Sequence, residues 1–453
     1  MPTRRSLVGI LAERQLVGGG VANLTLSDTG NVLFFIGRSL PLYSRYVLLY
    51  IGYTISVYCD AAMNRRYRIL MITRNFPPTI GGMERLAYHA YLELSKEFDV
   101  WLLGPSDSEQ YVADRTRLVE CRTKPLAAFL LCLQWHASRL ARRTGFDLVF
   151  ASSGMSALAA SAAARAARVP VITCVHGLDI VVQHALYRTF FLPAIRRSSR
   201  LIANSRHTAE LACDIGIGRD AIEILHPGVS IDGGRDFSAS GRFRARYGLV
   251  GRKLLLSVGR LLPRKGLPEF IRHVMPTLVA KHSDLTLAII GEEPRRALAA
   301  GHGELLRIQQ AVISSGMNQH VNVLGAVDDE TLHQAFADSD LFVFPVREIP
   351  GDIEGFGMVA LEAAVFGLPT VAFSVGGVAD AVGVGTSGYL IPPGDYEQLA
   401  RAVLRYFDSE SRALWRNRCI GHANRFSWEE YGAKLRKICS DTIKNRLTER
   451  LRT

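Results

Sequence analysis

Short apolar segments alternate with amphipathic segments along most of this chain, beginning near residue 67. The apolar segments are typical of buried parallel strands, and several of the segments between them carry apolar residues at the spacing of one helix face. This alternation predicts an α/β fold, in which a parallel sheet is flanked by helices. The first group of predicted strands covers residues 69–73, 100–103, 148–151, 171–175 and 201–203.

The alternation breaks once and then starts again. Residues 233–241, GGRDFSASG, have the composition of a linker. Two doubly wound, Rossmann-like domains facing each other across a cleft are therefore expected, with ligands at the carboxyl ends of the strands. The second group of predicted strands covers residues 254–258, 285–290, 321–324, 341–344 and 371–373.

The expected domain boundaries follow from this break. The first domain is predicted to span 67–240 and the second to span 241–427. Residues 428–453 are predicted to form a basic helix that packs back across the domains.

Residues 1–66 form an extension whose composition differs from the rest. Its segment 46–59, YVLLYIGYTISVYC, is apolar and uncharged, but a membrane-spanning helix needs about 20 such residues. The order of charged and apolar residues does not match a signal peptide. Two interpretations remain, namely an interfacial membrane segment or an extension upstream of a true start near Met63. We favour the second, because the residues after Met63 lead directly into the first predicted strand.

The charge balance indicates an anionic partner. The chain has 54 Lys and Arg against 42 Asp and Glu, a net charge of +12. Because no nucleic-acid-binding motif is present, we expect nucleotide phosphates or an anionic membrane surface rather than nucleic acid. The seven cysteines include no CxxC pair, which argues against a zinc site and makes a reducing cytoplasm the simplest interpretation.

Two glutamates lie around the start of a predicted helix in the second domain. Glu354 follows strand 341–344, and Glu362 lies two turns into the helix. Gly355 and Gly357 let the backbone approach a ligand, and the unpaired N–H groups of the first helical turn attract an anion such as a diphosphate. Phosphate would repel carboxylates, so these glutamates are expected to accept hydrogen bonds from sugar or ribose hydroxyls. A helix cap plus a solvated glutamate is the alternative.

Other loops after predicted strands carry candidate binding residues. Gly81 and Gly82 precede the best-defined helix, as in a phosphate or sugar loop, although a plain turn has the same composition. His176 follows strand 171–175 and is a site candidate by that position. Arg260 and Lys265 are five residues apart on one loop and could clamp a diphosphate, unless the loop is merely solvated.

One motif is set aside. Asp338 and Asp340 form an Asp-x-Asp pattern that can hold a divalent metal through carboxylate oxygens. They precede strand 341–344, so they lie at its amino end, opposite the expected ligand edge. We therefore expect no metal at these carboxylates.

Together these motifs resemble the family 4 retaining glycosyltransferases of GT-B fold. The resemblance runs from residue 68 to roughly 428, and its motifs follow the order expected for the family. The forms FPPTIGGMER and DIEGFGMVALEA look closest to membrane-associated mannosyltransferases that act on phosphatidylinositol mannosides. The matching pieces are Gly81-Gly82, His176-Gly177, Gly259-Arg260 with Lys265-Gly266, Glu354 to Glu362, and Gly376-Gly377 with Gly388-Tyr389.

The resemblance implies that the domain of residues 67–240 lies on the acceptor side and that the domain of residues 241–427 binds the nucleotide sugar. It also implies a role for each motif. Arg260 and Lys265 would hold the donor diphosphate and neutralise the leaving group. Glu354 would contact the donor sugar, and Glu362 would hold the ribose. Asp380 departs from the family, which often has a glutamate there. The remaining implied contacts are backbone amides of Gly355, Phe356 and Gly357 near the sugar, Val327 at the nucleobase, His176 near the transferred sugar, and Gly82 near the diphosphate and acceptor.

The expected activity is transfer of a hexose, with mannose and GDP-mannose favoured, to a lipid-linked or polysaccharide acceptor in cell-envelope glycan synthesis. The resemblance implies that no metal or other cofactor is needed and that the enzyme acts in the cytoplasm, peripherally on the inner face of the plasma membrane. The alternatives are a UDP-sugar-dependent glucosyl or GlcNAc transferase, a sugar-nucleotide epimerase and a non-catalytic nucleotide-sugar binder. A dehydrogenase is disfavoured, because no Gly-x-Gly-x-x-Gly follows the first strand with an acid about 20 residues on.

Overall fold

The structure is a computed structural model of the chain, and it describes residues 23–26, 32–35, 65–79, 81–231, 241–293, 303–408 and 412–452. The chain divides into two compact units, Met1–Tyr67 with Lys444–Thr453, and Arg68–Ile443. In the first unit, β1 (Asn23–Leu26) pairs antiparallel with β2 (Val32–Phe35). The apolar segment 46–59 and Met63 lie outside the described residues.

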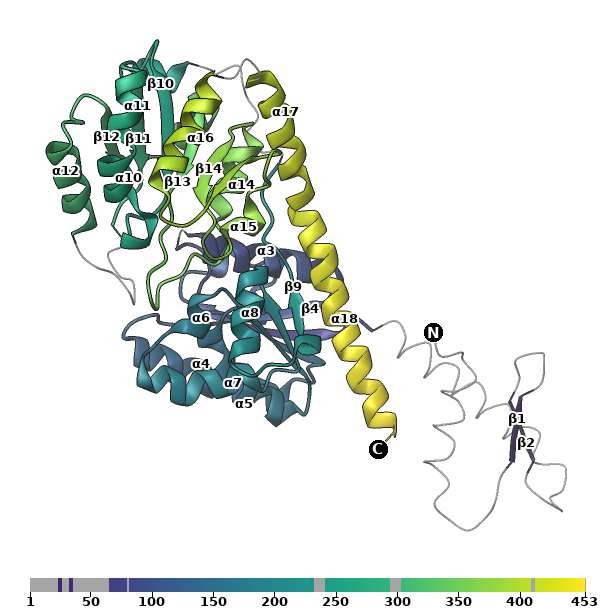
Figure 1. The fold of residues 1–453 in the computed structure, drawn as a ribbon. Coiled ribbons are helices and arrows are strands. Elements are labelled where there is room, and N and C mark those ends of the chain that lie inside the picture. The colour runs from purple at the N-terminus through teal and green to yellow at the C-terminus, as the bar shows by residue number, and fades with distance from the viewer. Residues whose placement is uncertain are drawn as a thin grey trace. The chain divides into compact units, whose positions relative to one another are not determined.

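The second unit contains two parallel sheets (Figure 1). The first sheet has seven strands in the order β5-β4-β3-β6-β7-β8-β9, and every neighbouring pair is parallel. Its strands are β3 (Arg68–Ile72), β4 (Asp99–Pro105), β5 (Leu118–Cys121), β6 (Leu148–Ala151), β7 (Val171–Val175), β8 (Arg200–Ala203) and β9 (Ile222–Ile224).

The second sheet has six strands in the order β12-β11-β10-β13-β14-β15, again all parallel. The predicted α/β fold with two doubly wound sheets is therefore confirmed. The strands are β10 (Lys253–Val258), β11 (Leu285–Ile290), β12 (Val321–Gly325), β13 (Leu341–Phe344), β14 (Thr370–Phe373) and β15 (Gly388–Ile391).

All the strands predicted from apolar segments are present, with ends within two residues of the prediction. The sequence patterns missed β5, β9 and β15, each of which lies at a sheet edge. Residues of these strands are only partly buried, so they lack the continuous apolar run of a central strand.

In each sheet the strand order reverses at one point, between β3 and β6 in the first and between β10 and β13 in the second. At such a switch point, the loops leaving two neighbouring strands run to opposite faces of the sheet. The crevice between the loops is where open α/β folds bind ligands. The loops after these four strands are therefore the positions where a site is expected.

Helices cover the sheets (Figure 1). The predicted stripe on the helix after Gly81-Gly82 is largely confirmed, because Leu86, Ala87, Ala90 and Leu94 are buried in α3 (Gly82–Glu97), while Met83 is half-buried. The other helices of the first sheet are α4 (Leu126–Arg143), α5 (Ala157–Ala167), α6 (Leu178–Val181), α7 (Leu192–Arg196) and α8 (Arg206–Asp214).

Shorter helices are more frequent around the second sheet, where they connect and cover its strands. These helices are α9 (Arg242–Arg246), α10 (Leu267–His273), α11 (Met275–Lys281), α12 (Glu304–Ser314), α13 (Asp329–Asp338), α14 (Met358–Val365), α15 (Val378–Ala381), α16 (Tyr396–Asp408) and α17 (Arg412–Ala423).

The helix α18 (Trp428–Arg452) returns to the first sheet. The Trp428 ring stacks on His89 of α3 at 3.9 Å, and Arg436 pairs with Glu93 and with Glu97, the latter at 2.8 Å. Because α17 packs against α14, this last part of the chain contacts elements of both sheets. The domain boundaries proposed from the linker composition remain a prediction.

Two cysteines form a disulfide that the cysteine spacing did not indicate. Cys121 at the end of β5 is bonded to Cys132 in α4. Disulfides are rare in a reducing cytoplasm, so this bond runs against the interpretation drawn from the cysteine pattern. Among the described helices, none combines the length and apolar character needed to cross a bilayer.

Candidate functional site

Four charged side chains meet at the switch point of the second sheet. Arg264 and Lys265 lie on the loop after β10, and Asp352 and Glu354 lie on the loop after β13. The Glu354 carboxylate accepts hydrogen bonds from Lys265 Nζ at 2.8 Å and from Arg264 Nε at 3.1 Å. Arg264 also donates to Asp352 at 2.9 Å. These side chains are only 10–13% exposed, so the loops are joined by a buried cluster of two cations and two anions.

The cluster keeps Glu354 ionised. Burial alone would raise the pKa of Glu354, but the charges of Lys265 and Arg264 outweigh burial and lower it to about 2. Burial also lowers the pKa of Lys265, against the opposing effect of Glu354. The Lys265 ammonium lies over the Phe344 ring, 4.6 Å from its centroid, which adds a cation–π contact.

Arg260 differs from its neighbours in the same loop. Its side chain is exposed, and no described residue forms an ion pair or hydrogen bond with it. Gly259 precedes it with a φ of 143°, and a Cβ placed on Gly291 would lie 1.9 Å from the Gly259 carbonyl oxygen. Close backbone packing therefore fixes the start of the loop while the Arg260 guanidinium stays accessible.

The glycines around Glu354 permit contacts that a side chain would block. A Cβ on Gly355 would lie 2.2 Å from the carbonyl oxygen of His176, so the loop after β13 touches the loop after β7. The Gly377 N–H donates to the Glu354 carbonyl at 2.9 Å, which joins the loop after β14 to the loop after β13. Gly357, with a φ of 88°, is the N-cap residue that directly precedes α14. These contacts bring two motifs predicted from sequence into one place.

His176 supplies a polar atom without a protein partner. Its Nε2 lies 2.8 Å from the Ser152 carbonyl oxygen, and because a carbonyl only accepts, Nε2 carries the hydrogen. Its backbone N–H donates to Asp179 at 3.0 Å. The other ring nitrogen, Nδ1, is buried and has no hydrogen-bond partner among the described residues. Nδ1 is therefore a buried polar atom whose hydrogen-bonding capacity is unused by the described residues.

The starts of α3 and α14 lie close together. A Cβ on Gly82, the first residue of α3, would be 3.6 Å from the Met358 sulfur at the first position of α14. Helix N-termini carry unpaired N–H groups and partial positive charge, so two of them side by side favour an anion. Arg85 of α3 forms an ion pair with Glu362 of α14. The glutamate that was expected to hold a ribose is therefore already paired with an arginine.

Two other predicted residues lie apart from the charge cluster. Phe356 is buried, and its ring faces His226 at 5.4 Å. Val327 follows β12, the edge strand, and β11 separates β12 from β10. Val327 therefore lies at the same carboxyl edge as Lys265 but two strands away, and it is partly buried against the core of the second sheet.

Sequence reasoning assigned no role to Arg264, Asp352 or the partner of Asp380. Arg264 neighbours Lys265, and Asp352 lies two residues before Glu354. Their charges, next to residues already predicted to bind a ligand, were the only sign in the sequence that they belong to the same site. The Asp380 carboxylate is 4% exposed and accepts from the backbone N–H and Nε of Arg206, both at 2.5 Å. Nothing in the sequence indicated that pair, because 174 positions separate its members.

The Asp-x-Asp carboxylates have structural contacts. Asp338 accepts backbone N–H groups from Gly241 at 2.6 Å and from Phe243 at 2.9 Å, at the start of α9. Asp340 forms an ion pair with Arg244 at 3.0 Å. Both lie at the amino end of β13, where the sequence placed them. Within the described parts of the chain, no three metal-ligating side chains form a group suited to a metal ion.

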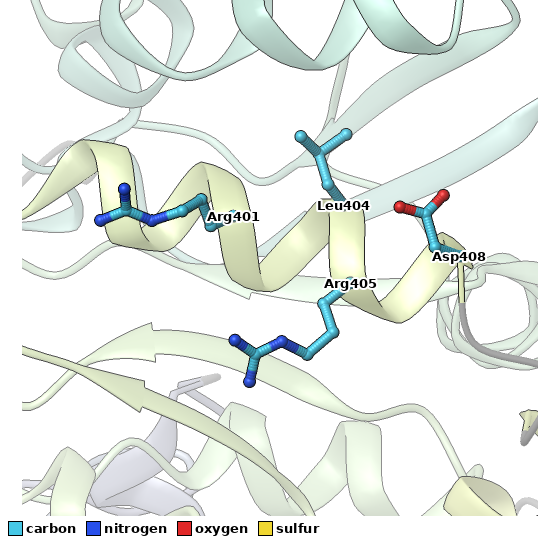
Figure 2. Close-up of a pocket in the computed structure, with 4 residues that line it drawn as sticks. All are labelled: Arg401, Leu404, Arg405 and Asp408. Atoms are coloured by element: carbon cyan, nitrogen blue, oxygen red, sulfur yellow. The ribbon is translucent and has the colours of Figure 1, made fainter.

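A separate hollow lies on α16, where Figure 2 shows Arg401, Leu404, Arg405 and Asp408. Its volume is about 450 Å³. The helix begins shortly after β15 ends and packs along β14 and β15, so its last turns point toward the amino ends of the strands. This hollow is therefore at the opposite edge from the charge cluster and is not the candidate site.

The fold and the site define a protein of the GT-B class, with two parallel α/β domains whose carboxyl-edge loops meet. Residues 241–426 match the family described as Glycosyl transferases group 1, and residues 80–232 match Glycosyltransferase Family 4. The chain belongs to the family 4 glycosyltransferases.

Similar proteins include both enzymes and solved structures. A GDP-mannose-dependent alpha-(1-6)-phosphatidylinositol monomannoside mannosyltransferase of Mycolicibacterium smegmatis is 28% identical, over 82% of this chain and 98% of that protein. D-inositol 3-phosphate glycosyltransferase 2 of Catenulispora acidiphila is 31% identical over 55% of this chain and 57% of its own. Anabaena HepE in complex with UDP and glucose has a TM-score of 0.66 at 19% identity, covering 84% of this chain and 100% of that one, and shows the common fold.

Proposed function

We propose that this enzyme transfers a hexose, with retention of configuration, from a nucleotide-sugar donor to a lipid-linked or polysaccharide acceptor. The observation that carries the proposal is the buried charge cluster of Lys265, Arg264 and Glu354 beside the facing starts of α3 and α14. It combines cations and helix N-termini, which suit a diphosphate, with an ionised carboxylate, which suits sugar hydroxyls.

The donor diphosphate is proposed to lie between the helix starts, against Arg260 and Lys265. Arg260 is accessible and needs no internal contact to be broken. Lys265, in contrast, already donates one hydrogen bond to Glu354, so a phosphate oxygen would compete with that carboxylate for its ammonium. Their two positive charges would neutralise the leaving nucleoside diphosphate as the bond to the sugar breaks, which is the role a divalent metal has in other transferases.

The reaction is a substitution at the anomeric carbon. The bond from that carbon to the diphosphate oxygen breaks, the acceptor hydroxyl oxygen forms the new bond from the same face, and the hydroxyl proton leaves with the diphosphate. The Glu354 carboxylate is proposed to accept hydrogen bonds from the sugar, near the amides of Gly355 to Gly357. His176 Nδ1 offers one further contact from the first domain.

GDP-mannose is the favoured donor. Support comes from the mannosyltransferase of M. smegmatis, which is similar over 98% of its length. The acceptors in the names of that enzyme and of the C. acidiphila glycosyltransferase both contain an inositol phosphate. The similar structures at 19% identity contain UDP or UDP-glucose, but they do not indicate the nucleobase of this enzyme's donor, because at that identity only the fold is comparable.

An anionic membrane surface is the proposed site of action. Between Arg122 and Arg200 the chain has eleven basic residues and two acidic ones, Asp147 and Asp179, a net +9 of the total +12. In the same segment α4 exposes Leu131 by 71% and Trp135 by 58%. A helix with exposed apolar side chains and basic neighbours suits a bilayer interface.

Flotation with phosphatidylcholine vesicles, with and without phosphatidylglycerol, tests the membrane proposal. Binding is expected only to the anionic vesicles, to weaken with salt, and to fall in the variant Leu131→Glu. Equal flotation of Leu131→Glu and the unchanged protein would contradict the assignment to α4.

Donor binding is the test of the proposed activity. Thermal shift with GDP-mannose, UDP-glucose, UDP-GlcNAc and UDP-galactose should show stabilisation by GDP-mannose above the others. The variant Arg260→Gln should lose about 100-fold in transfer without loss of stability, since no described residue pairs with Arg260. Arg272→Gln, an exposed arginine on α10, is the matched control.

Three outcomes decide between the alternatives. Stabilisation by none of the donors, or an Arg260→Gln variant that transfers normally, would contradict the proposal. Conversion of the donor sugar without any acceptor would indicate an epimerase. Donor binding with neither hydrolysis nor transfer would indicate a non-catalytic binder.

A further inference from the structure

The switch point of the first sheet also holds a cation, which is partly buried and has no carboxylate within ion-pair distance among the described residues. Arg74 follows β3, and the loop of residues 152–156 follows β6, so both lie in the crevice where the strand order reverses. The equivalent crevice of the second sheet holds Arg264, which has two carboxylate partners. In the described residues, Arg264 therefore has carboxylates at ion-pair distance and Arg74 has none.

The contacts of Arg74 are few. Its side chain is partly buried, and the one hydrogen bond that it forms to a described residue is from a guanidinium nitrogen to the Met155 sulfur at 3.2 Å. A thioether sulfur is a weak acceptor. No described carboxylate lies within ion-pair distance, since the nearby Glu84 accepts instead from the Asn75 amide at 2.6 Å. Burial lowers the pKa of Arg74, only partly offset by Glu84, which indicates an incompletely compensated charge.

Hydrogen bonds link this arginine to the transfer site. The hydroxyl of Ser152 donates to the hydroxyl of Thr73 at 2.6 Å, directly before Arg74. The carbonyl of Ser152 accepts from His176 at 2.8 Å. Gly82, at the start of α3, lies on the same loop as Arg74. A group bound at Arg74 would thus lie on the first-domain side, beside His176 and away from the Lys265 cluster.

We infer that Arg74 binds a phosphate group of the acceptor. This inference rests on the proposed function, and it narrows the acceptor to phosphate-bearing molecules. A guanidinium matches a phosphate with two parallel hydrogen bonds, which would replace its contact with the Met155 sulfur. The phosphate belongs either to a soluble polyol phosphate or to a phospholipid headgroup, because both offer the same oxygens to the arginine.

The experiment measures binding of a phosphate probe with the donor site filled. Protein saturated with GDP is titrated calorimetrically with myo-inositol 1-phosphate, with phosphate-free myo-inositol, and with short-chain phosphatidylinositol below its micelle concentration. The unchanged protein should bind at least one phosphate probe and should not bind myo-inositol. Arg74→Gln should weaken that binding about 10- to 100-fold, the usual effect of losing hydrogen bonds to a charged group.

Two further variants keep the test decisive. Arg74→Lys retains the positive charge but not the planar guanidinium, so its affinity for the phosphate probe should lie between those of the unchanged protein and Arg74→Gln. If Arg74→Gln folds poorly, weaker binding by Arg74→Lys than by the unchanged protein still tests the inference. Arg115→Gln, an exposed arginine paired with Glu109, is the control and should bind normally. Preference for myo-inositol 1-phosphate would indicate a soluble acceptor, and preference for phosphatidylinositol a lipid headgroup.

The inference fails separately from the proposed function. If GDP binds but no phosphate probe binds, or if Arg74→Gln binds the probe as tightly as the unchanged protein, the inference is overturned while the donor site stands. If GDP itself does not bind and no other nucleoside diphosphate replaces it, the proposed function is what fails.

Discussion

Replacing Glu354 by glutamine removes one negative charge from a buried cluster while keeping the size of the side chain. The amide can still accept one hydrogen bond, but Lys265 then lacks a charged partner. Arg264 is less affected, because Asp352 still accepts from it at 2.9 Å. The variant is therefore expected to be less stable than the unchanged protein, in addition to any loss of activity.

The magnitude follows from the pKa of Glu354, which is lowered from its ordinary 4.5 to about 2. A difference of that size between the folded and unfolded states is worth about 3 kcal/mol at pH 7, at 1.36 kcal/mol per pH unit. Because the pKa is lowered on folding, the contribution is complete above pH 4.5 and is lost as the pH falls toward 2. At pH 3 less than half of this contribution remains.

Thermal unfolding of the unchanged protein and of Glu354→Gln, followed by circular dichroism from pH 7 to pH 3, measures this effect. About 3 kcal/mol corresponds to a Tm lower by about 6–12 °C for a domain of this size. The difference should shrink by more than half at pH 3. Glu397→Gln, a change at an 80% exposed glutamate on α16, is the control and should not alter Tm. Equal Tm values for Glu354→Gln and the unchanged protein at pH 7, or a difference independent of pH, would refute the reasoning.

Three further changes test other contacts. Gly355→Ala places a Cβ 2.2 Å from the His176 carbonyl, so kcat/KM should fall about 100-fold, and normal kinetics would contradict the close approach of the loops. Asp380→Asn breaks the pair with Arg206 and should cost about 1–3 kcal/mol, measured as a lower Tm that a surface variant does not share. Cys121→Ser opens a disulfide that closes 11 residues, which should cost about 2–3 kcal/mol, with reductant then having no further effect on Tm.

Much of the fold could be predicted because central parallel strands are apolar on both faces. Strands such as β11, which is buried along its whole length, give a continuous signal in the sequence. The edge strand β9 has one buried residue of three and gives none. The linker and the second group of strands then sufficed to predict two sheets. Because ligands bind at the carboxyl edge of such sheets, the loops that follow the strands were the predicted binding loops.

The site was harder to predict, because side-chain pairing depends on distances that one chain does not reveal. The sequence placed Glu354, Lys265 and His176 on the correct loops, since each follows an apolar strand. It did not indicate that Lys265 and Glu354 bond to each other, or that Glu362 pairs with Arg85. Those contacts join residues 89 and 277 positions apart, and neither local composition nor spacing carries that information.

The bond between Lys265 and Glu354 places a condition on the donor under the proposed function. When Lys265 turns to a diphosphate, Glu354 loses its closest counter-charge, and burial then favours raising its pKa. Arg264 still donates to the carboxylate at 3.1 Å, and sugar hydroxyls are the further donors that a nucleotide sugar brings there. A nucleoside diphosphate alone supplies the phosphate but not the hydroxyls. The same glutamate thus makes the intact nucleotide sugar bind more tightly than the nucleoside diphosphate alone.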